Sequence, residues 1–344
     1  MLPFRNPFRI WSLMYGTGVS LRHKMFDNGM LKSVEFDVPV IGVGNIRVGG
    51  TGKTPCVEWL LERLQTQYKP AVLSRGYGRR TKGFRLVNTS DNARSVGDEP
   101  LQLKKKFPDV PVSVCEDRVT GIAQLLAESE ANLILLDDAF QHRYVKPSYN
   151  IVLSAFHQPF FKDELLPMGR LREHPKHLHR ADCVIYTKCP DNWREKRERY
   201  IAEVKRYAPN ALVGFSGIAY GAVRPLFAHP LTEIKQDILL VTGLADATPL
   251  VDYLKKRFNI VRHYDYPDHY NFFASDVRNW KNELEGHKEF QPVVFTTEKD
   301  AVRMLEQKSL VAELPVYVVP MKMEVLEGED ELMKELFRPL IDAD

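Results

Sequence analysis

Apolar and polar positions follow two different periods along this chain. Short runs of apolar residues, rich in β-branched side chains, are typical of buried strands. They fall at residues 38–41, 70–74, 111–115, 131–136, 149–153 and 183–187. Helical spacing follows several of these runs; in residues 56–64 the apolar positions 59, 60 and 64 share one helical face. Because strands and helices alternate, the pattern predicts a parallel sheet covered by helices, an α/β/α domain.

The pattern changes between residues 213 and 237, where short extended pieces are interrupted by glycines and prolines. A smaller α/β pattern follows, with strands expected at 238–242, 260–264 and 292–297 and helices at 247–258 and 300–306. We therefore predict four parts: an N-terminal helical segment (1–30), a large domain (31–212), a linker (213–237) and a smaller α/β domain (238–344).

A glycine-rich turn joins the first predicted strand to the helix after it. The turn ends in Gly49-Gly50-Thr51-Gly52-Lys53-Thr54, and Pro55 suits the first helical turn. Glycines let backbone N–H groups close around phosphate oxygens, and the helix N-terminus adds partial positive charge. The layout is that of a phosphate-binding loop, in which Lys53 would reach the β- and γ-phosphates and Thr54 would ligate Mg²⁺.

The loop departs from the usual pattern at one position. A glycine is expected six residues before Lys53, and Arg47 stands there. A glycine-rich turn without a ligand is the alternative interpretation, which the flanking strand and helix disfavour. The expected nucleotide-binding residues are Arg47, Val48, Gly49, Gly50, Thr51, Gly52, Lys53 and Thr54.

Two pairs of acidic residues support this interpretation. Asp137 and Asp138 end a buried apolar strand, the Walker B pattern that delivers a carboxylate to the Mg²⁺ shell. Asp98 and Glu99 stand where a helix begins, so capping alone would explain Asp98. The pair would also suit a base, Asp98, and a metal-side carboxylate, Glu99. With Thr54, these acids are the expected Mg²⁺ ligands.

Basic residues gather in two segments, 75–80 and 165–180. Such clusters suit anionic phosphate or a membrane face, although solvated arginines on an exposed turn are the alternative. Lys53, Arg118, Arg170 and Arg172 could spread the charge of a phosphoryl-transfer transition state. The histidines in the second segment (His174, His177, His179) lack a nearby cysteine or fourth ligand, which disfavours a metal site.

The first thirty residues form an unusual amphipathic segment. Phe4, Phe8, Trp11 and Tyr15 fall on one helical face, with Arg5 and Arg9 on another. This pattern fits a helix lying in the membrane interface, or equally a helix packing its stripe onto the domain. Arg9 interrupts any apolar core, so a signal peptide is not expected.

Composition narrows the class of protein. At 344 residues with 44% apolar and 27% charged residues, the chain is expected to form about two globular domains. The net charge of +3 does not indicate a nucleic-acid partner, and no obligate protein partner is predicted. Four cysteines without paired spacing suggest reduced thiols, and no apolar run approaches the length of a membrane span, about 20 residues.

Taken together, these blocks resemble the lipid A 4′-kinases (tetraacyldisaccharide 4′-kinases) over nearly the whole chain. The resemblance is carried by residues 43–55, 74–78, 97–100, 137–142, 167–173 and 267–270. It implies a P-loop NTPase-like α/β/α domain, a second smaller α/β/α domain and a β linker between them. It also implies transfer of the ATP γ-phosphate to the 4′-hydroxyl of a tetraacyldisaccharide 1-phosphate, giving lipid IVA, at the cytoplasmic face of the inner membrane.

The resemblance also assigns roles to single positions. Asp98 falls on the family's catalytic aspartate and His269 on the histidine proposed to support it. Lys53 and Thr54 fall on its phosphate and Mg²⁺ positions, and the sequence leaves open whether His269 reaches Asp98. The residues expected to contact the glycolipid are Asn45, Arg75, Arg118, His142, Arg170, Arg172 and Glu173.

A second class of protein, an ATP-driven membrane-associated switch, would carry a similar loop and membrane helix. Such switches usually have a lysine immediately before the paired glycines, where this chain has Val48. A switch would also have no use for the Asp98-Glu99 pair.

Overall fold

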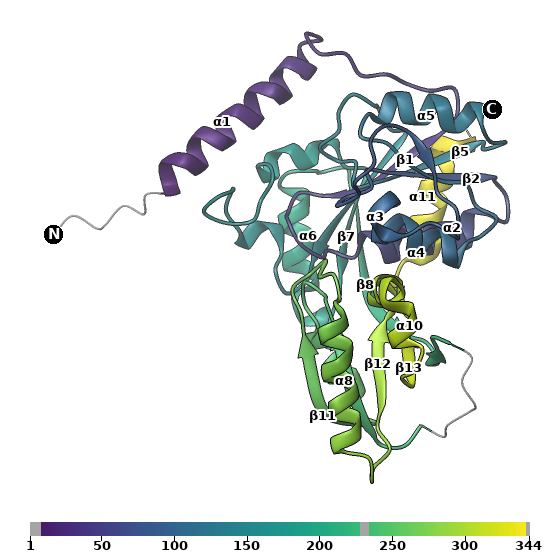
Figure 1. Ribbon diagram of the computed structural model, residues 1–344. Coiled ribbons are helices and arrows are strands. Elements are labelled where there is room, and N and C mark those ends of the chain that lie inside the picture. The colour runs from purple at the N-terminus through teal and green to yellow at the C-terminus, as the bar shows by residue number, and fades with distance from the viewer. Residues whose placement is uncertain (1–7, 228–233, 342–344) are drawn as a thin grey trace.

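The computed structural model describes residues 8–227 and 234–341 of the chain, which form two α/β units joined side by side (Figure 1). The helices are α1 (Phe8–Asp27), α2 (Lys53–Leu64), α3 (Ala93–Val96), α4 (Asp98–Lys106), α5 (Arg118–Ala127), α6 (Arg197–Lys205), α7 (Thr248–Lys255), α8 (Ala274–Gly286), α9 (Glu298–Met304), α10 (Lys308–Val311) and α11 (Glu329–Ile341). The strands are β1 (Val40–Asn45), β2 (Pro70–Ser74), β3 (Arg85–Leu86), β4 (Val112–Val114), β5 (Leu133–Asp137), β6 (Tyr149–Ala155), β7 (Cys183–Thr187), β8 (Leu212–Tyr220), β9 (Arg224–Pro225), β10 (Asp237–Thr242), β11 (Asn259–Asp265), β12 (Val293–Thr297), β13 (Val316–Val319) and β14 (Met321–Glu327).

The larger unit is built on a nine-stranded sheet in the order β14-β8-β7-β6-β1-β5-β2-β4-β3. The strand β1 lies in the middle and pairs in parallel with β5 and β6, which places Val43 opposite Asp137. Every residue of β1, β2, β5 and β7 is buried, as expected for strands covered on both faces. The parallel pairing brings the phosphate-loop end of β1 and the acidic end of β5 to the same edge of the sheet.

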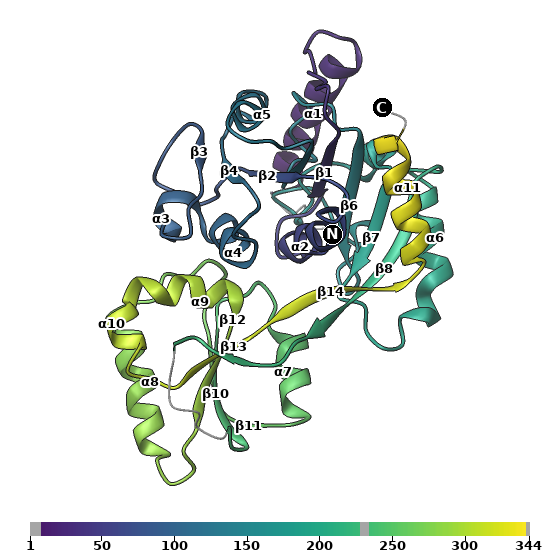
Figure 2. The same cartoon turned by 90° about the vertical axis from the view of Figure 1, so that its right-hand side faces the viewer.

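Helices cover the large sheet on both faces (Figure 2). On one face α2 packs its apolar side, including Trp59, Leu60 and Leu64, against alternate strand residues such as Ile41 and Leu135. On the other face α5 buries Ile122 and Leu125 among residues that include Val40 and Ile134. The α/β/α layering predicted from the sequence is confirmed.

The smaller unit is a five-stranded sheet in the order β11-β10-β12-β13-β9. The strands β10, β11, β12 and β13 run parallel, and the two-residue β9 pairs antiparallel with β13. Apolar clusters lie on its two faces, one around Trp280 of α8 and one around Leu250 and Leu254 of α7. The carboxyl ends of its strands face the large unit, which directs the loops after β11 and β12 toward the phosphate loop.

Two antiparallel strands, β8 and β14, connect the units and belong to the large sheet. The chain leaves through β8 and returns through β14, so residues 321–341 lie with the large unit (Figure 2). These limits differ from the predicted ones, which placed 213–237 in a linker and everything after 238 in the smaller domain. The sequence shows strands but not their partners, and the extended pattern of β8 continues the large sheet instead of leaving it.

The helix α1 lies along one side of the large unit (Figure 1). It is docked by a few polar contacts: Ser12 Oγ donates to the carbonyl of Leu165 at 3.0 Å, and Tyr15 Oη donates to that of Arg172 at 2.8 Å. The predicted stripe is largely solvent-exposed at Phe8 and Trp11, whereas Phe4 and Arg5 lie outside the described residues. None of the described helices is long and apolar enough to cross a membrane.

Candidate active site

The glycine-rich turn forms an open loop at the start of α2. Gly49 and Gly52 adopt positive φ angles of 116° and 86°, a region that glycine enters without a steric penalty. Behind the loop, Asn45 Nδ2 donates to Thr51 Oγ1 at 2.7 Å, and Thr187 Oγ1 donates to the Thr51 carbonyl at 2.8 Å. No side chain caps α2 at Gly52, so the first N–H groups of the helix point outward as an anion site.

Asp138 and two cations stand beside this loop. Lys53 Nζ lies 3.6 Å from Asp138 Oδ1, and Arg172 Nη1 donates to the same oxygen at 2.9 Å. Burial alone would raise the pKa of Asp138, but the positive charges of Lys53 and Arg172 outweigh it and lower that pKa. Asp138 therefore stays ionised at neutral pH and holds both cations at the mouth of the loop.

Asp137 is held differently from its neighbour. It is 2% exposed, Ser74 Oγ donates to its Oδ2 at 3.1 Å, and its Oδ1 has no hydrogen-bond partner among the described residues. Burial and the negative charge of Glu99 raise the pKa of Asp137 to about 7. A buried carboxylate oxygen without a donor, next to two further carboxylates, fits a divalent cation such as Mg²⁺.

A cavity of about 410 Å³ lies between the two units at this edge of the sheet. The large unit lines it with residues 48–55, Tyr77, Glu99, Gln102, Asp138, Arg172 and Lys188, and the small unit with Leu244, Ala245, Asp246, Asp268, His269, Glu298 and Lys299. Four described non-glycine residues have positive φ, and three of them line the cavity: Asp138 (51°), Lys188 (57°) and His269 (61°). Such strained backbone concentrates at functional sites.

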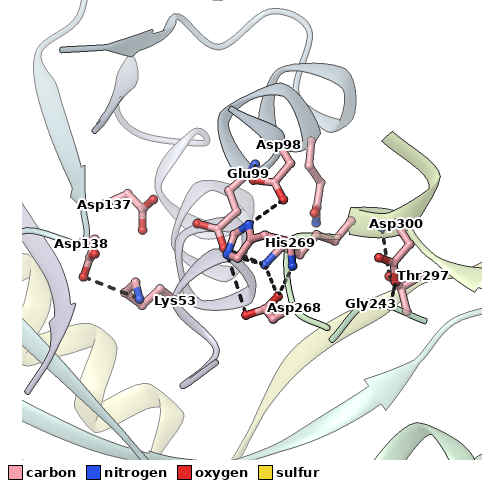
Figure 3. Close-up of polar contacts among 12 residues, drawn as sticks. Lys53, Asp98, Glu99, Asp137, Asp138, Gly243, Asp268, His269, Thr297 and Asp300 are labelled. Carbon is pink, nitrogen blue, oxygen red and sulfur yellow. Dashed lines mark hydrogen bonds and ion pairs between the residues drawn. The ribbon is translucent and has the colours of Figure 1, made fainter. Parts of the chain in front are cut away.

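Asp98 and His269 meet across the two units (Figure 3). Asp98 is the first residue of α4, and His269 lies in the loop after β11; the His269 Nδ1 to Asp98 Oδ2 distance is 3.0 Å. The contact that the sequence left open is therefore present. Asp98 is 5% exposed and lies behind His269, whose ring lines the cavity.

Two cations of α9, which sequence reasoning missed, complete this cluster. Arg303 donates to Asp98 Oδ2 through Nε at 2.8 Å and Nη2 at 2.6 Å, and Lys299 Nζ bridges Glu99 at 3.2 Å and Asp268 at 3.1 Å. Burial alone would raise the pKa of Asp98, but the His269 hydrogen bond, Lys299 and Arg303 hold it well below its usual range. The signal that could have found them is the polar run that directly follows β12, Glu298-Lys299-Asp300.

The remaining predicted residues differ in where they lie relative to the cavity. Arg172 lines the cavity, whereas Arg75 and Arg170 are exposed outside its lining. Arg47 is not part of the cavity lining; it donates to Asp163 Oδ2 at 2.5 Å. Asn45 braces the loop from behind.

Three other residues expected to contact the glycolipid are partly or fully buried. Arg118 is 2% exposed and donates to the carbonyls of Cys115 and Glu116. His142 is half-buried, and burial lowers its pKa to about 4. Glu173 is fully buried and accepts hydrogen bonds from Gln141 and Arg180, each at 2.6 Å. Glu173 is thus placed to brace the segment that carries Arg172, behind the cavity.

Residues of the histidine-rich segment 165–180 contact His23 of α1. The rings of His177 and His23 stack at 3.9 Å, and His23 Nε2 lies 3.0 Å from Glu173 Oε2. Arg143 Nη1 lies 3.2 Å from His23 Nδ1, which makes Nδ1 the acceptor and leaves the proton on Nε2, where it is donated to Glu173. A protonated Nε2 cannot ligate a metal, so this cluster ties α1 to the large unit.

A phosphate loop, a Walker B pair and an Asp-His pair that close on one cavity define a P-loop phosphotransferase. The family described as "LpxK: Tetraacyldisaccharide-1-P 4′-kinase" matches residues 5–340, and the chain belongs to this family.

Relatives and a solved structure agree with that assignment. A tetraacyldisaccharide 4′-kinase of Phocaeicola vulgatus is 42% identical over 332 residues, covering 93% of this chain and 91% of the relative. One of Flavobacterium johnsoniae is 40% identical over 319 residues, covering 91% and 90%. The crystal structure of LpxK from Aquifex aeolicus, in complex with ATP, matches with a TM-score of 0.74 at 27% identity, covering 96% of this chain and 97% of that one.

Proposed function

We propose that the protein transfers the γ-phosphate of ATP to the 4′-hydroxyl of tetraacyldisaccharide 1-phosphate, giving lipid IVA. The observation that carries this proposal is one cavity with a phosphate loop on one wall and the Asp98–His269 pair on the other. One wall suits the donor nucleotide and the other a hydroxyl that must lose a proton. A switch ATPase has no need of the second wall, and the names of the relatives supply the acceptor.

The phosphate wall would bind the nucleotide through the backbone of residues 49–54 and Lys53, with Arg172 reaching the γ-phosphate. Thr54, Asp137, Asp138 and Glu99 are the residues that would hold Mg²⁺. Mg²⁺, when bound, neutralises charge on the phosphate oxygens. Lys53 and Arg172 add fixed positive charge where the transferred group passes, which is the main contribution a protein makes to phosphoryl transfer.

The opposite wall suggests a division of roles between Asp98 and His269. Asp98 Oδ2 already accepts from His269 Nδ1 and from two Arg303 nitrogens, and Oδ1 accepts from the N–H of Glu99. A carboxylate so fully engaged is a poor proton acceptor. His269 Nε2 faces the cavity side of the ring and has one polar neighbour within hydrogen-bond range among the described residues, Lys299 Nζ at 3.3 Å. We therefore assign proton abstraction to His269 Nε2, once Lys299 gives way to the acceptor hydroxyl, and orientation of the ring to Asp98, in place of the sequence-based role of Asp98 as base.

The glycolipid would reach the cavity from a membrane surface along α1. The exposed residues of α1 include Ile10 (68%), Leu13 (72%) and Met14 (60%), which form a contiguous apolar face. Exposure of such a face to water is unfavourable, and burial in a membrane interface would remove that cost. The same helix donates from Tyr15 to the carbonyl of Arg172, so the apolar face and the cavity are joined by one contact. We propose a peripheral position at the cytoplasmic face of the inner membrane.

The proposed reaction is tested with labelled ATP and the purified disaccharide acceptor. Wild-type protein should label the acceptor, and His269→Gln and Asp98→Asn should lower kcat by about 10²- to 10⁴-fold while ATP still binds. His263→Gln is the matched control, because His263 lies in the same unit and its ring contacts Thr242, away from the cavity lining. ATP hydrolysis without labelled acceptor would favour the switch and refute the kinase.

The membrane position has its own test. Replacing Ile10, Leu13 and Met14 by glutamine should prevent co-flotation with anionic phospholipid vesicles and raise KM for vesicle-borne acceptor. The replacement leaves Ser12, Tyr15 and His23 in place, so α1 stays docked. Phe290→Gln is the control, since Phe290 is also an exposed apolar side chain (47%) but lies in the small unit. Unchanged flotation of the triple variant would contradict the proposal.

A further inference from the structure

Arg303 is a buried cation at the boundary between the two units. It is 3% exposed and projects from α9 of the small unit toward the first turn of α4 in the large unit. Its Nε and Nη2 both reach Asp98 Oδ2, the oxygen that accepts from His269 Nδ1. One carboxylate oxygen thus connects the guanidinium of α9 to the imidazole that lines the cavity.

The guanidinium is itself fixed from behind. Arg303 Nη1 donates to Asp300 Oδ1 at 3.1 Å and to the carbonyl of Gly243 at 3.3 Å. Asp300 is fully buried, and its Oδ2 accepts from the N–H of Gly243 at 3.1 Å and from Thr297 Oγ1 at 2.7 Å (Figure 3). The residues at the ends of β10 and β12 therefore fix the position of Arg303, and its guanidinium group has little conformational freedom.

We propose that Arg303 is a positioning residue for phosphoryl transfer, which acts through Asp98 to hold His269 at the cavity when the two units are together. The inference rests on the proposed role of His269. Asp98 belongs to the large unit and His269 to the small one, so the pair forms only at one relative placement of the units. Arg303 fixes that placement from the small unit, because it holds the same oxygen as His269.

Simple attachment of the units does not require this arrangement. Besides the pairs at Asp98, three ion pairs of the described residues cross the boundary: Arg94 to Glu306 at 2.9 Å, Lys106 to Glu298 at 3.4 Å and Lys299 to Glu99 at 3.2 Å. The first two contact neither Asp98 nor His269, whereas Lys299 Nζ lies 3.3 Å from His269 Nε2. A buried ion pair is also a weak source of stability, because desolvation of both charges offsets their attraction. The geometry of Arg303 is better explained by the orientation it imposes on Asp98 than by adhesion.

Four variants separate positioning from attachment. Arg303→Met removes the charge and both donors, Arg303→Lys keeps the charge, and Arg303→Ala leaves room for added guanidinium ion. Arg94→Met is the matched control, since it breaks another Arg–carboxylate pair at the same boundary. For each variant, kcat, both KM values, ATP affinity and Tm are measured at several pH values.

Arg303→Met should lower kcat about 100-fold with KM for ATP within about threefold, the scale expected from misplacing a reacting group. Arg303→Lys should recover at least a tenth of the wild-type kcat, and millimolar guanidinium should restore Arg303→Ala but leave Arg94→Met unchanged. Added to Asp98→Asn, Arg303→Met should cause no further loss, because both changes act through one contact.

The inference is overturned if Arg303→Met keeps kcat within about threefold of wild type, or if its loss is matched by Arg94→Met. It is also overturned if guanidinium restores nothing and the loss adds in full to that of Asp98→Asn, which would make Arg303 an independent structural residue. Failure of the wild-type protein to label the acceptor would instead refute the proposed function, so the two failures are distinguishable.

Discussion

The two walls of the cavity are built in opposite ways. The phosphate wall, residues 49–54 with Asp137 and Asp138, comes from the ends of two adjacent strands and leaves backbone N–H groups open. The Asp-His wall, Asp98 with His269 and Arg303, joins residues up to 205 positions apart and satisfies nearly all its polar groups internally. The first wall needs a ligand to complete it, whereas the second needs the other unit.

This difference implies different sensitivities. A change in the phosphate wall removes an interaction with the ligand itself and should affect turnover directly. A change in the Asp-His wall alters the relative placement of protein groups and should affect turnover through geometry, with ATP binding preserved. Variants in each wall test this difference when kcat and KM for ATP are measured separately.

The largest effect is expected at Lys53. Lys53→Met removes a positive charge from the phosphate wall and should lower kcat by about 10³-fold, because fixed charge at the transferred group cannot be replaced by water. KM for ATP should also rise, unlike in the Arg303 variants. Kinetics of the variant check this, with the exposed Lys69→Met as control. A loss in kcat without a rise in KM for ATP would mean that Lys53 also acts through geometry. The proposed difference between the two walls would then be wrong.

An intermediate effect is expected at Gly97, which precedes Asp98 with φ 92°. Alanine there is strained by about 1–3 kcal/mol, and its Cβ would lie 3.2 Å from the Tyr77 carbonyl. Relief of the strain displaces the start of α4, so Gly97→Ala should lower kcat about tenfold or more with KM for ATP unchanged.

Gly83→Ala is the control for this variant. Gly83 also has positive φ, 76°, but nothing outside its chain neighbours lies within 4 Å of its Cβ position. If both variants lose the same fraction of kcat, backbone strain in general is responsible, and the placement of Asp98 is not the cause.

The contrast also explains what the sequence could predict. The phosphate wall could be predicted because its residues are neighbours along the chain. Residues 49–54 hold glycines, a lysine and a threonine, and two acids follow one another at a strand end. The α/β/α fold followed from the alternation of periods for the same reason. Both predictions depend on neighbours along the chain, and the structure confirms the fold.

The Asp-His wall was only partly readable. The sequence singled out Asp98 and His269 but could not show that they touch, and it passed over Arg303 and Lys299, which read as ordinary helix residues. Glu173 was expected at the glycolipid, yet it is buried against His23 and Arg180 because α1 packs there. Such contacts depend on which elements pack together, and no local pattern encodes that.

The smallest expected effect separates the walls by pH. Asp98 has a lowered pKa and stays charged, whereas Asp137 has a pKa near 7, well above the value of about 4 in an unfolded chain. At a pH between the unfolded and folded pKa values of Asp137, the folded state holds one proton more than the unfolded state. The free energy of unfolding therefore falls as pH rises from about 4 to about 7, and the loss is complete above pH 7.

Asp137→Asn removes this loss without changing the size of the side chain. Its Tm relative to wild type, measured in EDTA, should be higher at pH 8 than at pH 5 by about 5 °C, taking about 2 °C per kcal/mol, the lower end of the range for chains of about 150–250 residues. Asp163→Asn is the control, because Asp163 has a lowered pKa set by Arg47 and nearby backbone N–H groups, away from Asp137, and its effect should not vary over this range. Excess Mg²⁺ and ATP should abolish the advantage of Asp137→Asn, since only the charged carboxylate can serve the ligand. A Tm difference that does not change with pH would contradict the raised pKa of Asp137, and another group would then carry the uncompensated charge of the phosphate wall.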